Sequence, residues 1–162
     1  MADKKILDNI KKLREITGVG FSDCKLAIIE TNGDLEKSIE YLRKKGIAKA
    51  SKKMSRIAAD GLIIVNSNNG NISAIEINSE TDFVAKNKDF ISFCKEVASI
   101  NFKNEADLNK LNKSKMDNGK TVEENLVTLI SKIGEKITIR RAKFFNKEGN
   151  NYFYVHNSSE KN

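Results

Sequence analysis

The chain has 162 residues, with 29 Lys and Arg against 22 Asp and Glu, and a formal net charge of +7. That length predicts one domain, or a small module joined to a larger one. The apolar content of 39% is too high for a disordered chain, and no run approaches the roughly 18 apolar residues of a membrane span. Charged helical sequence from the start, without an apolar signal region, predicts a cytoplasmic protein.

The residue types that carry most covalent chemistry are scarce. The single histidine is His156, and the two cysteines, Cys24 and Cys94, lie far apart in the sequence. This argues against His-based metal sites, paired-cysteine sites and Ser-His or Cys-His catalysis. Neither glycine pattern of the common nucleotide-binding loops is present. We therefore expect a binding protein rather than an enzyme, with no cofactor and no metal, and core positions for both cysteines.

Residues 1–46 are predicted to form a module of three short helices. The apolar side of the first helix consists of Ile6, Ile10, Leu13 and Ile16, at helical spacing. Ser22 or Asp23 is expected to cap the second helix, and Asp34 the third. The third helix is expected to end at Gly46, which follows three cations.

Residues 47–60 are predicted to form a basic helical linker. Seven Lys and Arg residues lie between Arg43 and Arg56, and no acid follows until Asp60. Such a stripe can contact phosphates, contact an acidic protein face, or simply form a solvated helix surface. RNA-binding modules usually combine basic residues with aromatic ones, and this stretch has none. An RNA- or ribosome-associated module is therefore the alternative hypothesis, and direct nucleic-acid binding is not expected.

Residues 61–156 are predicted to form an α+β core, followed by a tail at 157–162. Two β-rich runs, 61–65 and 72–77, flank Asn and Gly residues that favour a hairpin turn. Helices capped by Asp89 and by Thr121 are expected after it, separated by a polar, mobile stretch at 104–120. Strands at 136–145 and 152–156 complete an antiparallel sheet of about three or four strands packed with helices.

The segment from 78 to 87 is the main candidate for a function, because an acid, Asp82, directly precedes a large apolar ring, Phe83. In a structural interpretation, Thr81 or Asp82 caps a helix and Phe83 packs against its first turn. In a functional interpretation, an aromatic side chain on a loop fills a pocket of a partner.

Two weaker alternatives come from other features. A three-helix module of this size could be an adapter for ubiquitin-like or other protein surfaces, although only fold analogy supports this. An enzyme could use paired carboxylates such as Glu123-Glu124, but no His, Cys or metal set converges on them.

Several motifs occur in an order that resembles one family. They are Asn78-Ser79-Glu80-Thr81-Asp82-Phe83-Val84-Ala85-Lys86-Asn87, then Leu13-Arg14-x-x-Thr17-Gly18-x-Gly20-x-x-Asp23-Cys24-Lys25, and Lys132-Ile133-Gly134-Glu135-x-Ile137-x-Ile139-Arg140-Arg141. This set is similar to bacterial elongation factor Ts over about residues 5–145, with a weaker match at Tyr154-Val155-His156. Phe21 and Ser22 depart from the two methionines that many members carry there. The N-terminal module then corresponds to a UBA-like bundle.

The resemblance implies a guanine nucleotide exchange factor of translation elongation, whose partner is the GTPase elongation factor Tu. It also implies that GDP leaves because the factor disturbs the Mg²⁺ and phosphate site, and that GTP then displaces the factor. The resemblance assigns that disturbance to Thr81, Asp82, Phe83 and Val84. It assigns docking on the GTPase domain to Leu13, Arg14, Gly18 and Phe21. His156 is a weaker candidate for a partner contact. The chain is similar to the short, single-core form, which pairs as a homodimer, although its residues do not decide whether it pairs.

Overall fold

The computed structural model describes residues 2–148 and 150–155 of the chain. By its internal contacts the chain divides into two compact units. The helical unit comprises Met1–Ser55 and Val127–Glu135, and the sheet unit comprises Arg56–Leu126 and the chain from Lys136 onward. The chain therefore passes between the units at three places.

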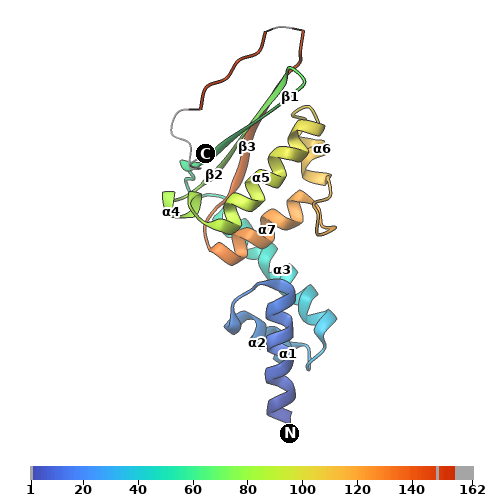
Figure 1. Cartoon of the computed structure of the whole chain (residues 1–162). Coiled ribbons are helices and arrows are strands. Elements are labelled where there is room, and N and C mark those ends of the chain that lie inside the picture. The colour runs from blue at the N-terminus through green and yellow to red at the C-terminus, as the bar shows by residue number, and fades with distance from the viewer. Residues whose placement is uncertain (1, 149, 156–162) are drawn as a thin grey trace. The chain divides into compact units, whose positions relative to one another are not determined.

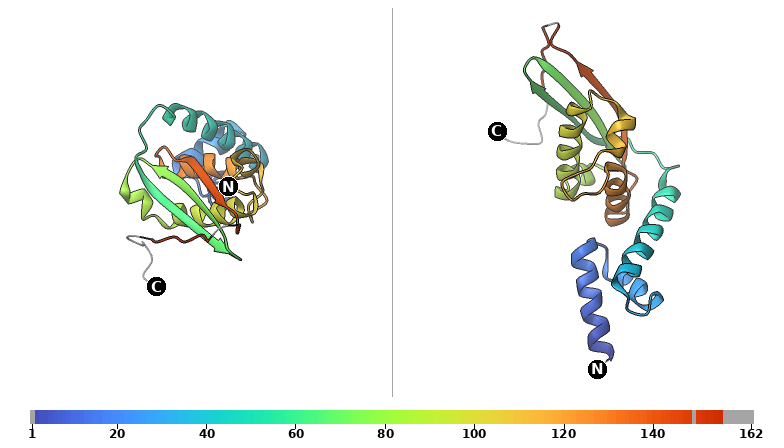
Figure 2. Two further views of the ribbon diagram at one scale, coloured as in Figure 1. Left: turned by 90° about the horizontal axis from the view of Figure 1, so that it is seen from above. Right: turned by 90° about the vertical axis from the view of Figure 1, so that its right-hand side faces the viewer.

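Three helices form most of the helical unit: α1 (Ala2–Thr17), α2 (Phe21–Glu30) and α3 (Leu35–Lys53) (Figures 1 and 2). Their apolar faces meet in a core of Ile10, Leu13, Val19, Cys24, Ala27, Ile28 and Leu42. Ile6 and Ile16 were expected in this core but are exposed. Ile16 lies about 90° around the helix from the centre of the face formed by Ile10 and Leu13, so the bundle does not cover it.

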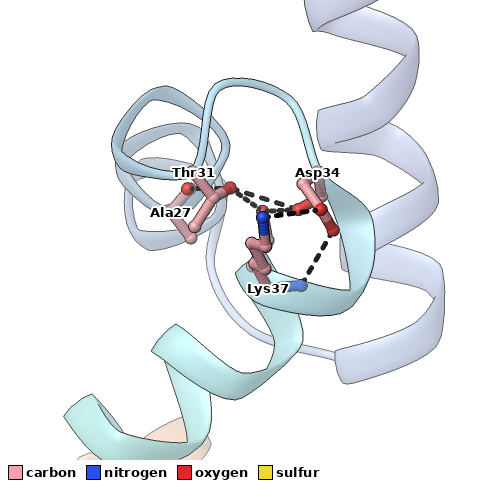
Figure 3. A network of polar contacts seen from close by, with 5 residues as sticks. Ala27, Thr31, Asp34 and Lys37 are labelled. Carbon is pink, nitrogen blue, oxygen red and sulfur yellow. Dashed lines mark hydrogen bonds and ion pairs between the residues drawn. The ribbon is translucent and has the colours of Figure 1, made fainter.

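The turn between α2 and α3 is closed by a network of polar contacts (Figure 3). The Thr31 hydroxyl donates to the Ala27 carbonyl at 2.8 Å, and the Asp34 carboxylate accepts from the backbone N–H of Lys37 at 3.0 Å. The second contact satisfies one of the backbone donors left free at a helix start. Asp34 is therefore the N-cap of α3, as predicted.

Two predicted helix boundaries in the helical unit are wrong. α2 begins at Phe21, so Ser22 and Asp23, the predicted caps, lie within its first turn. α3 does not end at Gly46 but continues for two further turns. Gly46 is buried, and a Cβ there would already contact Val127 at 3.7 Å. Close packing against this later segment of the helical unit, rather than a helix stop, accounts for the glycine.

The sheet unit is built on an antiparallel sheet in the order β1 (Asp60–Asn68), β2 (Asn71–Ser79) and β3 (Thr138–Phe145). Asn69 and Gly70 join β1 to β2 with φ angles of 52° and 81°. Positive φ at both central residues is the signature of a type I′ turn, whose twist matches that of the strands. The predicted hairpin is therefore confirmed.

The remaining helices are α4 (Asp82–Ala85), α5 (Lys88–Lys103), α6 (Leu108–Lys113) and α7 (Val122–Ile133), which continues into the helical unit. α5 packs on one face of the sheet (Figure 1) and buries Phe90, Phe93, Cys94 and Val97. The ring of Phe102 on α5 meets that of Phe144 on β3 edge-on, with centroids 5.7 Å apart. Helices followed by a three-stranded antiparallel sheet with packed helices make the α+β architecture that was predicted.

The caps of α5 and α7 show one correction and one confirmation. Asn87, not Asp89, caps α5: its side-chain oxygen accepts from the backbone N–H of Asp89 at 2.9 Å and of Phe90 at 3.3 Å. Thr121 caps α7 as predicted, because its hydroxyl oxygen accepts from the N–H of Glu124 while the Glu124 carboxylate accepts from the N–H of Thr121. This reciprocal pair is a capping box.

Two segments differ from the expectation. Residues 104–120 were expected to be mobile, but they contain α6 and bury Leu111 and Met116. Two apolar residues five positions apart leave no periodic signal in a polar stretch. A strand was expected at 152–156, but residues 151–155 form none in the described chain, and the Asn151 side chain donates instead to the Gly70 carbonyl at 3.1 Å.

Gly61 allows the close approach of β1 to the end of β2. Its φ is +133°, and a Cβ there would lie 2.2 Å from the Ile77 carbonyl oxygen. We expect Gly61→Ala to lower the free energy of unfolding by about 2 kcal/mol or more, because the strands must separate. Urea denaturation measures this loss. The control is Gly119→Ala, at φ +77° in open space, with an expected loss of about 1 kcal/mol; equal losses would disprove the close-approach explanation.

Candidate functional site

Phe83 lies on α4, the single short helix between β2 and α5 (Figure 1). The exposed fraction of its side chain is 79%. Burying such a side chain would contribute about 1.5–3 kcal/mol, and the chain does not obtain this stabilisation. The structural interpretation, in which the ring packs against its own helix, therefore does not hold.

The chain on both sides of Phe83 is anchored. Before α4, Ser79 is buried and its hydroxyl donates to the Thr81 carbonyl at 3.0 Å. Directly after Phe83, Val84 is buried. After α4, Asn87 caps α5. The exposed ring thus stands on a base held at both ends, which lowers the ordering cost of placing it in a partner.

Asp82 and Lys86 form an ion pair along α4, with 2.6 Å between carboxylate oxygen and ammonium nitrogen. The hydrogen bond from Lys86, together with its charge, lowers the pKa of Asp82, and the same contact raises the pKa of Lys86. Because both side chains are exposed, solvent screens the pair and it adds little stability. It holds the carboxylate of the residue that precedes Phe83 toward Lys86. Lys86 was missed as this partner, although its four-residue spacing on a helix was the available signal.

Two of the predicted contact residues are buried. Leu13 has no exposed surface and belongs to the core of the helical unit, and Val84 is almost completely buried. Neither side chain is available to a partner in the structure as it stands, and the contacts expected of them stay a prediction. They instead fix the neighbouring positions. Thr81 is partly exposed at the start of α4, and His156 lies outside the described residues.

The other residues predicted for docking surround the turn between α1 and α2. Arg14 is exposed in the last turn of α1, and its carbonyl accepts from the backbone N–H of Gly18 at 2.8 Å. Gly18 is exposed and Phe21 begins α2 with a side chain 43% exposed. The turn thus presents a cation, a bare backbone and an apolar ring, a combination suited to a protein surface.

The basic stripe between Arg43 and Arg56 is engaged in contacts within the protein. Lys45 and Lys49 both reach the carboxylate of Asp23, at 3.1 and 2.7 Å. The hydrogen bond from Lys49 is the main cause that lowers the pKa of Asp23. Further contacts join Lys44 with Glu40, Lys53 with the Gly134 carbonyl and Arg56 with Glu80. These cations thus contact groups of the protein itself, and the RNA-binding module stays an alternative hypothesis.

Other kinds of site find little support in the structure. Both cysteines are free and buried, as predicted, and burial raises the pKa of the Cys94 thiol to about 12, which makes it unreactive. Within residues 2–148 and 150–155, no group of three or more His, Cys, Asp or Glu side chains is arranged to hold a metal ion. In the same part of the chain, every helix is too short or too polar to cross a bilayer.

The ion pair on α4 predicts how Asp82 titrates. Because its pKa is lowered in the folded chain, the pair stabilises above the ordinary carboxyl range, and this contribution is lost as the pH falls through the lowered pKa. Lys86→Met should move the titration midpoint of the Asp82 carboxyl carbon, followed by NMR, upward. Lys88→Met, at the exposed start of α5, is the matched control and should leave the midpoint in place. If Lys86→Met leaves the titration midpoint of Asp82 unchanged, the two side chains do not form this ion pair in solution.

A comparison with known families finds a match over the second half of the chain. The family model described as Elongation factor TS matches residues 80–161, just over half of the chain. The match begins at Glu80, at the base of α4, and it includes Asp82, Phe83, α5 and β3. The chain therefore belongs to the elongation factor Ts family.

Proposed function

We propose that this chain is a guanine nucleotide exchange factor that binds elongation factor Tu in its GDP form and promotes GDP release in the cytoplasm. The family acts in translation elongation, and its general partner is elongation factor Tu. The family consists of nucleotide exchange factors rather than covalent catalysts. The observation that supports the proposal most is Phe83, whose ring is 79% exposed on an anchored base. It is an apolar anchor that the described residues of its own unit leave uncovered.

Exchange requires that the factor bind the GTPase more tightly when nucleotide and Mg²⁺ are absent than when they are present. The free energy of that preference acts reciprocally, so it lowers the affinity for GDP by the same amount. Nucleotide held at nanomolar affinity is bound by about 12 kcal/mol, and a thousandfold weakening requires about 4 kcal/mol. Rebinding of GTP displaces the factor through the same linkage.

Phe83 is proposed to supply this preference by entering the GTPase near its Mg²⁺ and phosphate site. Burial of the ring in the empty form contributes about 1.5–3 kcal/mol, less than the requirement. Steric overlap of the ring with the metal-bound arrangement adds to the difference, because it penalises the loaded form. Asp82 contacts partner groups beside the ring, and Thr81 presents both from the end of β2.

The turn between α1 and α2 is proposed to dock on the GTPase domain. Arg14 pairs with a partner carboxylate, Gly18 allows close approach of the backbone, and Phe21 covers an apolar spot. Contacts that are equal in the loaded and empty forms raise the affinity for both and do not favour release. Changes to the docking residues should therefore alter the concentration of the factor that gives half-maximal release. Changes to Phe83 should alter the maximal rate of release.

Homodimerisation is a second part of the proposal. The strand register places Ile63, Ala74 and Phe145 on the sheet face opposite to that of Ile64 and Ile75. Ile63 and Phe145 are 67% and 49% exposed. A second copy of the chain would cover these apolar side chains, in agreement with the resemblance to the pairing, short form. The mass of the chain in solution tests this part.

Phe83→Ala is expected to lower the maximal rate of GDP release about ten- to a hundredfold, because about 1.5–3 kcal/mol of preference for the empty form is removed. The free energy of unfolding should change by less than about 0.5 kcal/mol, since the ring is exposed. Stopped-flow release of a fluorescent GDP analogue from elongation factor Tu measures the first quantity, and urea denaturation the second.

Two further variants make this result specific. Tyr152→Ala removes another aromatic ring, 88% exposed, and should release GDP at the unaltered rate. Arg14→Ala should raise the concentration for half-maximal release and reduce its salt dependence, with little change in maximal rate. If Phe83→Ala promotes GDP release at the unaltered maximal rate, the ring has no part in the mechanism.

A further inference from the structure

The Glu80 carboxylate lies at the base of α4 and accepts hydrogen bonds from two distant segments. Its Oε1 accepts from the backbone N–H of Lys136 at 2.6 Å and from the Arg56 guanidinium at 3.3 Å. The Lys136 ammonium in turn donates to the Arg56 carbonyl at 2.8 Å, which closes a ring of three residues. The Glu80 side chain is only 21% exposed. Charge-assisted bonds with limited solvent access are stronger than exposed ion pairs.

The two partners of Glu80 occupy special positions in the chain. Arg56 and Lys136 are the first residues of the sheet unit at the two places where the chain arrives from the helical unit. Glu80 itself lies between the last residue of β2 and the residue that precedes α4. One carboxylate thus ties both incoming segments to the chain that carries Phe83.

The neighbouring contacts keep this junction close to the sheet. The Asn78 side chain donates to the Asp60 carbonyl at 3.0 Å, which links the end of β2 to the start of β1. Arg56 lies four residues before that start. A displacement of the segment at Arg56 would therefore act on the base of α4 by two routes, through Asp60 and through Glu80.

We propose that Glu80 is the positioning residue for Phe83: it holds the base of α4 to the two segments that enter the sheet unit, so that the ring is fixed while the GTPase is bound. This inference rests on the proposed exchange function. A ring on a loosened base would lose part of its binding free energy in ordering the base, and a misplacement of about 1 Å can cost up to about a hundredfold in rate.

The test compares Glu80→Ala with Glu80→Gln in the full chain. We expect Glu80→Ala to lower the maximal rate of GDP release from elongation factor Tu about tenfold, with half-saturation changed less than about twofold. Glu80→Gln should have an intermediate rate, because a carboxamide oxygen still accepts from the Lys136 N–H but does not pair with Arg56. Amide hydrogen exchange at Lys136, measured in the free chain, should accelerate in Glu80→Ala and much less in Glu80→Gln.

Glu96→Ala provides a matched control. The Glu96 carboxylate accepts from the backbone N–H of Asp117 at 2.6 Å, the same kind of bond as that of Glu80 with Lys136. We expect this variant to release GDP at the unaltered rate. If Glu96→Ala and Glu80→Ala lose rate equally, in proportion to their loss of unfolding free energy, general destabilisation explains both and the positioning role is excluded.

The remaining outcomes separate this inference from the proposed function. Normal release by Glu80→Ala, together with impaired release by Phe83→Ala, overturns the role of Glu80 and leaves the exchange function in place. Normal release by Phe83→Ala overturns the exchange mechanism itself. In that case, amide exchange at Lys136 that is equal in Glu80→Ala and the unaltered chain would overturn the hydrogen-bonded junction as well.

Discussion

The end of β2 is held tightly in place while the aromatic residue four positions beyond it remains in solvent. Gly61 brings β1 against the Ile77 carbonyl, where a side chain would not fit. The Asn78 amide then donates to the Asp60 carbonyl, and the buried Ser79 hydroxyl donates to the Thr81 carbonyl. Phe83 would gain about 1.5–3 kcal/mol by burial, but α4 is one turn long and anchored at both ends. The ring of Phe83 therefore cannot reach the core of its own unit and stays in solvent.

This arrangement is what the role that we propose for Phe83 requires. An exposed, preorganised ring keeps its free energy of burial available for another protein, and little of it is lost in ordering the chain. The Asp82 carboxylate, next to Phe83 in the sequence, is held by Lys86, and we propose that it makes a polar contact with the partner. The turn between α1 and α2 offers Arg14 and Phe21 as separate contacts. In the mechanism that we propose, displacement of the nucleotide and attachment to the GTPase thus belong to different residues.

The elements with strong local signals could be predicted from the sequence. Apolar periodicity identified α1 and α5, the Asn69-Gly70 pair identified the hairpin, and Thr121 identified the start of α7. Elements set by tertiary packing could not be predicted this way. Gly46 matches the pattern of a helix end, yet it lies within α3. Its lack of a side chain allows α3 to pack closely against Val127 and Ser131.

The candidate site was predictable as a stretch but not as a set of exposed side chains. The motif from 78 to 87 identified the region around Phe83, but a motif does not show which of its residues face inward. Leu13 and Val84 were expected to contact a partner and are buried instead. The bonds of Glu80 with Arg56 and Lys136 join residues 24 and 56 positions apart, so no local pattern could indicate them.

The solvent exposure of Phe83 before and after the GTPase binds is the most direct test of the mechanism. A single 4-fluorophenylalanine at position 83 reports exposure through the difference in its ¹⁹F shift between H₂O and D₂O. A large difference is expected in the free chain, and it should disappear in the complex with nucleotide-free elongation factor Tu. A ring that keeps the full solvent effect in that complex would show that Phe83 does not enter the partner.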